Sequence, residues 1–598
     1  MKSEHFVSIC RHLLINPDAT QRELAVAAGF SLGLINTVIN ECINLGYLEF
    51  KPENTSQNKN KKLILTKSGK EHLETFKVTN AIILAAGFGS RFVPLTYEKP
   101  KGLLSVYGEP MIERQIKQLH EKGITDITIV VGYKKESFDY LIDRYGVSLV
   151  FNPEYAVKNN LSSLKVAVDK LKSTYLLMSD FWIEDNIFNT YEARSWYSTV
   201  YEAGEVNEWC VSTKKSGKIK KITIGGSDAL TLIGPAYLTP SFSELFRGLV
   251  YEYYNRRGTD DYYWEHILLD HLKDLEIYAN IQTGNVHEFE NLEELRLFDH
   301  SYNNASNSKI MKTIASIFNV SEDMIQDIKP IKIGMTNYSF TFVGDDTKYI
   351  MRIPGEGTDK LINREQEYMA YKLIEGLGIC DDVVYIGRET GYKITKNIEN
   401  ARVCDPLNMK DVKACMKKLK EFHAMKLQVP FSFDIFERIE YYESLWLRNE
   451  SCFQDYEQTK DNIMSLKSFI EQAEKEWGFT HIDAVPDNFM FVPGEEIQLI
   501  DWEYASMQDQ HVDIAMFAVY AMYDREQVEK LIDSYFEKGC SDETRTKIYA
   551  YIAMCGMLWS NWCEYKSDFG VEFGEYSLRQ YRFAKDYYKI FKEKTRGK

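Results

Sequence analysis

Residues 481–489 read HIDAVPDNF and hold a group of side chains that suits phosphoryl transfer. Asp483 can accept a proton from an attacking hydroxyl, and Asn488 follows five residues later. Asp501 comes next, behind the apolar start of LIDWEYA. One Asp that accepts a proton, together with an Asn and an Asp that bind Mg²⁺, is the working set of a phosphoryl-transfer site. The spacing therefore predicts a kinase-like site in the last third of the chain.

A second pattern with chemical potential lies near the start of the chain. Gly87 and Gly89 directly follow the apolar run NAIILAA, which is typical of a buried strand. Backbone N–H groups of such a turn can surround phosphate groups, because no Cβ blocks their approach. Arg91 and Lys101 follow and supply positive charge. This pattern predicts a turn that binds a nucleoside triphosphate.

The composition limits the classes of protein to which the chain can belong. Its 598 residues favour several domains, and a hydrophobic content of 44% allows a core in each. A net charge of −16 argues against nucleic acid or an anionic membrane as the main partner. The ten Cys form no CxxC pair, and the N-terminus lacks an apolar signal region. We therefore expect a soluble cytoplasmic protein with reduced thiols.

The pattern of elements predicts a multidomain fold with three segments. Residues 1–76 are expected to form a small winged-helix domain, and 78–300 an α/β Rossmann-like domain with a mostly parallel sheet. Residues 310–598 begin with two strand-like stretches and continue as helices, which indicates an α+β bilobal protein-kinase-like domain. The polar stretch SYNNASNSK between the last two segments is expected to be a linker.

The first segment carries a capping box, Thr20 with Glu23, and a second helix is expected from about Ser31 to Leu45. With the strand-like YLEF and KKLILT, it resembles a winged helix-turn-helix. The expected recognition helix has no Arg or Lys with which to contact guanine. Weak DNA binding and a structural or oligomerising role therefore both stay open for this segment.

The string LAAGFGSRFVPLTYEKPKG resembles the sugar-1-phosphate nucleotidyltransferase family, in its LAAGxGxR…KPK form. Within that family, the chain looks most like the subgroup that is selective for phosphocholine and CTP. The resemblance implies catalytic roles for Arg91 and Lys101. It implies nucleotide contacts from Ala85, Ala86, Gly87, Gly89, Asn160 and Ser162.

The same resemblance implies a magnesium site and a phosphocholine site in the middle segment. Asp180 ends a buried strand and is expected to bind Mg²⁺, with Glu290 of EFEN as a second carboxylate in place of an Asp. Tyr263, Trp264 and Glu265 are expected to surround the trimethylammonium through cation–π and charge contacts. Plain packing of the two aromatic residues is the alternative.

The last segment resembles the choline/ethanolamine kinase family over nearly its whole length. IKIGMTNYSF occupies the place of a phosphate-covering loop, and Arg352 occupies that of the usual kinase lysine. The resemblance implies that Asp483 accepts the alcohol proton, that Asn488 and Asp501 hold Mg²⁺, and that Asn337 and Arg352 bind ATP. Glu367, or else Glu365, is expected to pair with Arg352. His481 is expected to brace its loop.

A quaternary ammonium has no N–H to donate, so its site needs ring faces and carboxylates. The late aromatic stretch GMLWSNWCEY resembles the helix that helps to build the choline pocket of this family. The candidate residues are Glu503, Asp513, Trp559, Trp562 and Tyr565, with packing in a core as the alternative. One tryptophan of the family is Gly556 here, and we expect Trp562, about one turn beyond Trp559, to compensate.

Together the two halves predict a bifunctional enzyme that makes CDP-choline from choline, ATP and CTP, with phosphocholine as the intermediate and Mg²⁺ at both sites. Two alternatives remain: the same steps on ethanolamine or another amino alcohol, and a transcription regulator that senses choline and nucleotide. Amino-alcohol and nucleotide selectivity, DNA binding, homo-oligomer formation and domain arrangement cannot be derived from the sequence.

Overall fold

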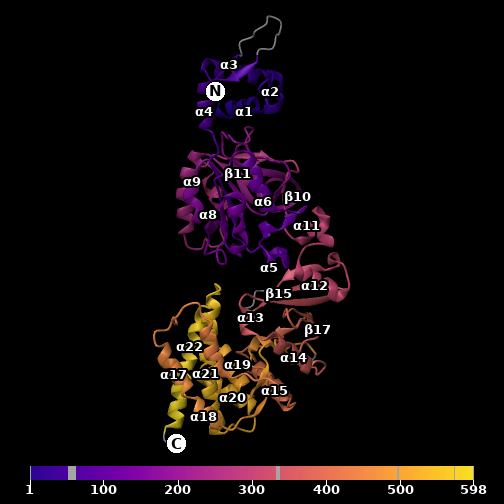
Figure 1. Cartoon of the computed structure of the whole chain (residues 1–598), viewed down its shortest axis with the longest axis vertical. Helices are drawn as coiled ribbons and strands as arrows, with labels where there is room; N and C mark the ends of the chain where they lie inside the picture. The colour runs from indigo at the N-terminus through magenta and orange to yellow at the C-terminus, as the bar shows by residue number, and fades with distance from the viewer. Residues whose placement is uncertain (1, 51–61, 332–336, 495–496, 572, 597–598) are drawn as a thin grey trace. The chain divides into compact units, whose positions relative to one another are not determined.

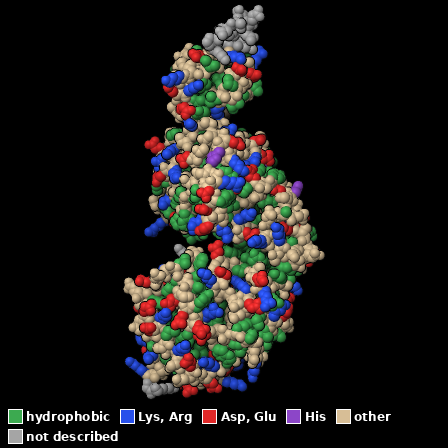
Figure 2. All heavy atoms as spheres, viewed as in Figure 1, with side chains coloured by type: hydrophobic (Ala, Val, Ile, Leu, Met, Phe, Trp, Pro, Cys, Tyr) green, Lys and Arg blue, Asp and Glu red, His purple; other side chains and the backbone are tan. Residues whose placement is uncertain are grey.

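The computed structural model describes residues 2–50, 62–331, 337–494, 497–571 and 573–596 (Figure 1). Contacts divide the chain into two compact units. One unit is Met1–Thr313 with Ser321–Asp323, and the other is Ile314–Val320 with Met324–Lys598. Acidic and basic side chains are interspersed on the face of the described residues that Figure 2 shows.

The N-terminal segment is a helical unit with a small sheet. It consists of α1 (Ser3–Ile15), α2 (Gln21–Ala28), α3 (Leu32–Asn44), the antiparallel strands β1 (Leu48–Phe50) and β2 (Leu63–Leu65), and α4 (Lys67–Glu74). The predicted capping box of Thr20 and Glu23 is present at the start of α2. The stretch that joins the two strands, 51–61, lies outside the described residues. No single described helix is long and apolar enough to cross a membrane, and only α2 with α3, bent by 111°, meets that test as a pair.

A seven-stranded sheet forms the centre of the first unit, with the order β12-β10-β11-β8-β3-β6-β7. The strands β3 (Asn80–Ala85), β6 (Ile127–Val131), β7 (Ser148–Phe151) and β8 (Thr174–Met178) run parallel, as the apolar runs predict. The long strands β10 (Trp196–Thr213) and β11 (Ile219–Leu238) form a hairpin, and β12 (Tyr278–Ile281) runs parallel to β10. Beside the sheet, β9 (Phe181–Ile183) pairs with β13 (Val286–Glu288).

Helices cover both faces of this sheet. Successive side chains of β3 point to opposite faces, so this strand contributes to a core on each side. Ile82 and Leu84 belong to one apolar core, with side chains of α8 (Asn160–Ala167), α9 (Pro240–Tyr254) and α10 (Glu265–His271). Ala81, Ile83 and Ala85 belong to a second core, with α6 (Met111–Glu121). The sheet is thus buried on both faces, and its functional groups collect where the strands end.

The stretch expected to be a linker is instead hydrogen-bonded to other residues of the first unit. Residues His300–Asn303 form a 3₁₀ turn, and the Tyr302 hydroxyl donates to the Ser105 carbonyl at 2.6 Å. Glu98 accepts from the backbone N–H groups at the start of α12 (Lys309–Phe318). The polar composition of this stretch serves hydrogen bonds rather than solvation, so the linker prediction is wrong here.

The second unit begins with a five-stranded antiparallel sheet in the order β14-β15-β16-β18-β17. Its strands are β14 (Gln326–Pro330), β15 (Asn337–Gly344), β16 (Thr347–Pro354), β17 (Val383–Ile386) and β18 (Lys393–Lys396), and the helix α14 (Arg364–Ile374) follows β16 in the chain. Part of the predicted phosphate-covering loop, 332–336, lies outside the described residues.

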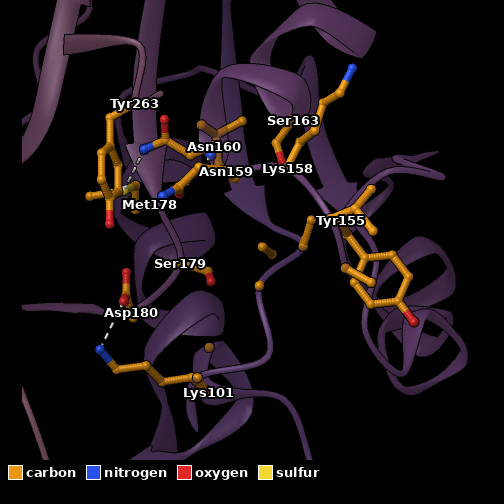
Figure 3. Close-up of a pocket in the computed structure, with 18 of the residues that line it drawn as sticks. Lys101, Tyr155, Lys158, Asn159, Asn160, Ser163, Met178, Ser179, Asp180 and Tyr263 are labelled. Atoms are coloured by element: carbon orange, nitrogen blue, oxygen red, sulfur yellow. Dashed lines mark hydrogen bonds and ion pairs between the residues drawn. The ribbon is translucent and has the colours of Figure 1, made fainter. Parts of the chain in front are cut away.

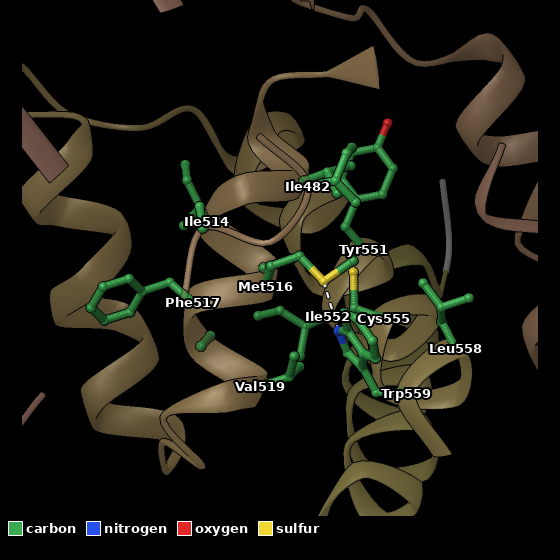
Figure 4. Close-up of a cluster of buried hydrophobic side chains, with 14 of the residues drawn as sticks. Ile482, Ile514, Met516, Phe517, Val519, Tyr551, Ile552, Cys555, Leu558 and Trp559 are labelled. Carbon is green, nitrogen blue, oxygen red and sulfur yellow. Dashed lines mark hydrogen bonds between the residues drawn. The ribbon is translucent and has the colours of Figure 1, made fainter. Parts of the chain in front are cut away.

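The rest of the second unit is a large helical lobe around one core. It contains α15 (Met409–Ala424), α16 (Ile435–Ser444), α17 (Tyr456–Met464), α18 (Lys467–Gln472), α19 (His511–Tyr520), α20 (Arg525–Tyr535), α21 (Asp542–Ser567) and α22 (Glu575–Thr595). Figure 4 shows part of the core, where Met516 of α19 meets Trp559 of α21.

Gly556 allows α21 and α22 to approach one another closely. A Cβ at this position would lie 2.7 Å from the carbonyl oxygen of Gln580 and 2.8 Å from the backbone nitrogen of Ala584. Both atoms belong to the backbone of α22, so they cannot move aside at low cost. A tryptophan of the family pattern therefore has no room at this position.

Candidate active sites

The first candidate site lies at the carboxyl ends of β3 and β8. A cavity of about 430 Å³ opens there (Figure 3). Its lining includes eight of the predicted residues, namely Ala85, Ala86, Gly87, Gly89, Lys101, Asn160, Asp180 and Tyr263. Gly89 has a φ of +68°, and a Cβ there would lie 3.0 Å from the Lys101 Cβ. The turn after β3 thus needs glycine at this point, and it exposes backbone to the cavity.

Lys101 and Asp180 form an ion pair in the lining of this cavity. Lys101 Nζ lies 2.9 Å from Asp180 Oδ2, and the side chains are 15% and 23% exposed (Figure 3). The same ammonium lies 4.8 Å from the centroid of the Phe92 ring. A half-buried ammonium that pairs with a carboxylate can turn to a phosphate once a nucleotide enters.

Glu288 is a second carboxylate close to Asp180, and the sequence did not predict it. Protein atoms around Glu288, and then the charge of Asp180, raise the pKa of the Glu288 carboxyl. The side chain is nevertheless exposed, so solvent moderates this shift. The predicted second ligand, Glu290, forms an ion pair with Arg91 instead. The register that sets Glu288 opposite Phe181 explains the arrangement, because Phe181 directly follows Asp180.

The two predicted polar contacts at the start of α8 differ in their placement. The Asn160 Oδ1 accepts from the Trp264 backbone N–H at 2.9 Å, and Asn160 lines the cavity. Ser162 is buried, and its hydroxyl donates to the Asn159 carbonyl and accepts from Asn152. Ser163, one residue later, lines the cavity in its place. A nucleotide contact from the Ser162 hydroxyl is therefore wrong.

Of the three predicted phosphocholine contacts, the structure places only Tyr263 at the cavity. Trp264 is 2% exposed and stacks on Tyr197 at 5.2 Å, so its ring serves the core. Glu265 is buried and accepts from the Tyr197 hydroxyl at 2.7 Å, and burial raises its pKa to about 7. The missed partner is Trp209 of β10, whose ring stands edge-on to Tyr263 at 6.3 Å. The aromatic pair thus comes from two distant stretches of the chain.

Arg352 is the centre of the second candidate site. Its side chain is 6% exposed and forms ion pairs with Glu367, Asp501 and Glu503, the latter two at 3.0 and 3.2 Å. Glu365, the other partner considered, forms an ion pair with Arg388 instead. Three carboxylates around one guanidinium hold the β16 strand, α14 and the Asp501 turn together.

Asp483, Asn488 and Asp501 form the group that HIDAVPDNF and LIDWEYA predict. Asn488 Nδ2 donates to the Asp483 carbonyl at 2.8 Å and to Asp483 Oδ2 at 3.2 Å. Burial, and then the charges of Asp501 and Glu503, raise the pKa of Asp483, which makes its carboxylate a stronger proton acceptor. Burial alone would raise the pKa of Asp501, but Lys393 and Arg352 lower it.

Asp513 has a structural task rather than a ligand. Its carboxylate accepts from the backbone N–H groups of His481 and Ile482 at 3.0 and 2.7 Å, and it contacts His423 Nε2 at 3.0 Å. Because Asp513 is fully buried with both oxygens in use, a choline contact is wrong. His481 is also buried, and its Nε2 lies 3.0 Å from the Ile500 carbonyl, which joins the loops of Asp483 and Asp501.

Asn337 Nδ2 donates a hydrogen bond to Glu503 Oε2 at 3.0 Å. Glu503 is 5% exposed, and burial followed by the charge of Asp501 raises its pKa to about 7. In the structure the Glu503 carboxylate is thus engaged by Arg352 and Asn337.

Aromatic side chains gather around Asp483. Trp559 stands edge-on to Tyr504 at 5.8 Å and to Trp562 at 5.5 Å. Burial is the main cause of a raised pKa at Tyr504, Tyr520 and Tyr576, and the charge of Asp483 adds a smaller contribution at each. The sequence reasoning missed the three tyrosines, although Tyr504 stands within LIDWEYA. Such rings beside a carboxylate can receive a quaternary ammonium.

Tyr565 has a different contact from the one expected. Its hydroxyl donates to the Gly357 carbonyl at 3.0 Å, and the next residue, Lys566, donates to the Glu356 carbonyl at 2.8 Å. Both bonds tie the end of α21 to the loop that follows β16. Tyr565 therefore fastens this loop, and its hydroxyl does not face the aromatic group around Asp483.

The donor atoms at both sites suit Mg²⁺, which prefers oxygen ligands and usually one or two carboxylates. At the first site, Asp180 and Glu288 bring two negative charges close together, and a cation would relieve their repulsion. At the second site, the Asn488 amide nitrogen donates to Asp483. The Asn488 amide oxygen is then the atom that could bind a cation together with Asp501. Among the described residues, no group of three or more His, Cys, Asp or Glu side chains could hold a metal on its own.

A nucleotide-binding turn with a Lys–Asp pair and a kinase-like Arg–Glu–Asp group define the chain as a fusion of two transferase domains. Residues 80–199 match the Nucleotidyl transferase family, and residues 328–554 match the Choline/ethanolamine kinase family. The chain is 38% identical over 229 residues to a 2-aminoethylphosphonate cytidylyltransferase of Lancefieldella rimae, which covers 38% of this chain and 93% of that protein.

Two further relatives represent the two domains. A choline-phosphate cytidylyltransferase of Streptococcus pneumoniae is 36% identical, over 38% of this chain and 98% of that protein. The crystal structure of the choline kinase LicA from Streptococcus pneumoniae is 28% identical with a TM-score of 0.42, over 47% of this chain and 98% of that one. The chain belongs to the nucleotidyltransferase family, with a cytidylyltransferase-like domain that is fused to a choline kinase domain.

Proposed function

We propose that the chain makes CDP-choline in two steps at two sites. The kinase domain transfers the γ-phosphoryl group of ATP to choline, and the nucleotidyltransferase domain joins phosphocholine to the cytidylyl group of CTP and releases pyrophosphate. The observation that carries this proposal is that one chain holds both sites, since the product of the first reaction is the substrate of the second.

The kinase domain also helps to choose among substrates of the cytidylyltransferase. One relative is named for 2-aminoethylphosphonate. The phosphorus of a phosphonate is already bonded to carbon, so such a substrate needs no kinase to prepare it. A kinase domain on the same chain therefore favours a phosphate ester of an amino alcohol.

In the proposed kinase reaction, Asp483 orients the choline hydroxyl and accepts its proton. The hydroxyl oxygen attacks the γ-phosphorus of ATP, the bond to the bridging oxygen breaks, and ADP leaves. Arg352 supplies positive charge to the ATP phosphates, and Glu367 holds its guanidinium in place. Asn488 and Asp501 would hold Mg²⁺, which neutralises charge on the transferred group when it is bound.

In the proposed cytidylyl transfer, a phosphate oxygen of phosphocholine attacks the α-phosphorus of CTP, and the bond to the β-phosphate breaks. The turn from Ala85 to Gly89 receives the triphosphate on its backbone N–H groups, and Lys101 leaves Asp180 to pair with phosphate oxygens. Asp180 and Glu288 would hold Mg²⁺ there, while Arg91 and Glu290 form an ion pair at the edge of the site.

Choline rather than ethanolamine is favoured by the type of side chain around Asp483. The quaternary ammonium needs ring faces and negative charge, which the mutually packed rings of Tyr504, Trp559 and Trp562 and the carboxylates of the site would supply. Ethanolamine would bring three N–H donors and favour a site richer in hydrogen-bond acceptors. In the other domain, the Tyr263 ring lines the cavity and would offer a face to phosphocholine, with the Trp209 ring edge-on to it.

For the N-terminal segment, we propose a winged helix-turn-helix with a structural role. Arg11 donates to the Tyr191 carbonyl at 3.3 Å, Glu4 pairs with Arg194 at 3.0 Å, and Glu74 accepts from the Tyr191 hydroxyl at 2.6 Å. These contacts fasten α1 and α4 to the nucleotidyltransferase domain. A gel shift at moderate salt tests the DNA-binding alternative, because such binding depends strongly on salt. Cytoplasmic location and homo-oligomer formation stay predictions.

One mass-spectrometric assay with choline, ATP, CTP and Mg²⁺ tests the proposal. The wild type should form CDP-choline. Asp483→Asn should form it only from added phosphocholine, and Asp180→Asn should stop at phosphocholine, so that each variant is the control of the other. We expect each lost step to slow by ~10²–10⁴-fold. Binding of ligands without turnover in the wild type would instead support a regulator that senses choline and nucleotide.

A further inference from the structure

Two buried side chains without an assigned role lie behind Asp501. Lys393 of β18 is 6% exposed, and Tyr371 of α14 is 3% exposed. The Lys393 ammonium donates to the Tyr371 hydroxyl at 2.5 Å, and it lies 4.7 Å from the centroid of the same ring. Burial of an ammonium is costly unless polar partners surround it, and the Tyr371 hydroxyl and ring are such partners for Lys393.

The Tyr371 hydroxyl also accepts the backbone N–H of Trp502 at 3.2 Å. Trp502 is fully buried and directly follows Asp501, which has a φ of +64°. A residue other than glycine in this left-handed region needs its surroundings to hold it. A buried N–H without a partner costs about 1–3 kcal/mol, so the Tyr371 oxygen stabilises this particular turn.

Two cations from adjacent strands, Arg352 and Lys393, contact the Asp501 turn or a residue bonded to it. The register of β16 and β18 sets Arg352 opposite Lys393. Arg352 contacts Asp501 directly at 3.0 Å. The helix α14 therefore holds the Asp501 turn at two points: Glu367 acts through Arg352, and Tyr371, one turn further along, acts through the Trp502 N–H.

We propose that Tyr371 and Lys393 are positioning residues of the kinase site. Tyr371 fixes the Asp501–Trp502 turn so that the Asp501 carboxylate faces the nucleotide, and Lys393 holds the Tyr371 hydroxyl in the orientation that accepts the Trp502 N–H. This inference rests on the proposed kinase function. It adds to that proposal a route by which the position of α14 controls the affinity of the site for its metal ion.

The test begins with Tyr371→Phe, which removes one oxygen and keeps the ring. We expect the Mg²⁺ concentration for half-maximal choline phosphorylation to rise by ~10–100-fold. Binding of Mn²⁺ in the presence of ADP, followed by electron paramagnetic resonance, should weaken by a similar factor. Cytidylyl transfer by the same chain should not change, which makes the other domain an internal control.

The matched control is Tyr368→Phe, one turn earlier in α14. Tyr368 is partly exposed, and its hydroxyl forms no hydrogen bond within the described residues. Loss of this hydroxyl should leave the Mg²⁺ requirement unchanged. A Tyr371→Phe variant with the Mg²⁺ requirement and Mn²⁺ affinity of the wild type would overturn the inference. So would an equal effect of Tyr368→Phe.

A second pair of variants decides the matter if Tyr371→Phe loses the folded kinase unit. Lys393→Met should raise the Mg²⁺ requirement. Lys393→Arg should keep the requirement closer to that of the wild type, because Arg, unlike Met, keeps a cationic donor. Equal Mg²⁺ requirements for Met and Arg would contradict the proposal. A wild type that leaves choline unphosphorylated would refute the proposed function, while Mn²⁺ binding with ADP would still test the role of Tyr371.

Discussion

The two candidate sites handle charge in opposite ways. In the nucleotidyltransferase domain, one ion pair, Lys101 with Asp180, lies at an open cavity beside a turn of backbone N–H groups. In the kinase domain, the buried Arg352 meets Glu367, Asp501 and Glu503, and Lys393 adds a second cation. The first site presents a polar surface that the substrate completes, whereas the second balances its own charges before any substrate arrives.

This difference teaches where stability and activity are linked. The Lys101–Asp180 pair is partly exposed at a cavity, where water screens the two charges and competes for both partners, so we expect it to contribute less to folding. Within a buried network, removal of one charge leaves the others uncompensated in a medium of low polarity. Catalytic residues of the kinase domain are therefore also structural, while those of the nucleotidyltransferase domain can be exchanged with little effect on the fold.

The sharpest test of the comparison pairs Arg352→Met with Lys101→Met. We expect Arg352→Met to destabilise the kinase unit by about 3–5 kcal/mol, because the buried carboxylates of Glu367 and Glu503 and the partly exposed Asp501 each lose an ion-pair partner. Lys101→Met should change stability by less than about 0.5 kcal/mol and slow cytidylyl transfer by ~10²–10³-fold. Urea denaturation with a probe in each unit measures both. Equal destabilisation by the two variants would break the comparison.

A second test uses a glycine in each domain. Gly556→Ala places a Cβ 2.7 Å from the backbone of α22, so we expect the kinase unit to lose about 1–3 kcal/mol. Gly102→Ala meets the Ser179 side chain at 2.5 Å, next to Lys101 and Asp180, and should lower cytidylyl transfer more than stability. Thermal unfolding and the two activity assays separate these outcomes. A Gly556→Ala protein with unchanged melting would show that the helices can part easily.

A third test measures how much a buried carboxyl that has no ion-pair partner among the described residues lowers the free energy of unfolding. Burial raises the pKa of Glu265 to about 7, so between the ordinary value of 4.5 and about 7 the folded state binds more protons than the unfolded state. The free energy of unfolding therefore falls as the pH rises through this window. Glu265→Gln should remove this slope and stabilise the first unit at pH 8 by about 1–3 kcal/mol.

The control for this test is Glu244→Gln on the exposed side of α9, which should leave the pH dependence unchanged. Unfolding of the first unit is followed by fluorescence from pH 5 to pH 8. A Glu265→Gln protein that keeps the slope of the wild type would show that another group is responsible.

The smallest expected effect concerns the aromatic group around Asp483. Trp562→Leu removes a ring that stands edge-on to Trp559, and the KM for choline should rise by ~2–30-fold, which corresponds to about 0.5–2 kcal/mol. The KM for ATP should not change, and ethanolamine should be affected less than choline. Steady-state kinetics with both alcohols measure this. An equal loss for both would indicate a packing role for Trp562.

Much of the fold follows from local patterns in the sequence. The apolar run before Gly87 predicts a buried strand and a phosphate-binding turn, and β3 with its turn lies there. HIDAVPDNF and LIDWEYA predict neighbouring loops, and the contacts of Asn488 and His481 bring them together. Such patterns are readable because the residues are close in sequence, so the periodicity and turn chemistry of one element suffice.

The amino-acid sequence by itself determined the order of the domains, the glycine turn and the Asp483–Asn488–Asp501 set. Only the tertiary structure decided that Glu288 rather than Glu290 faces Asp180, that Asp513 holds a loop, and that Trp209 rather than Trp264 stands beside Tyr263. These choices depend on strand register and on packing between segments far apart in the chain. A shift of one residue in strand pairing moves a side chain from the face of a site to the face of a core. No local sequence pattern carries that information.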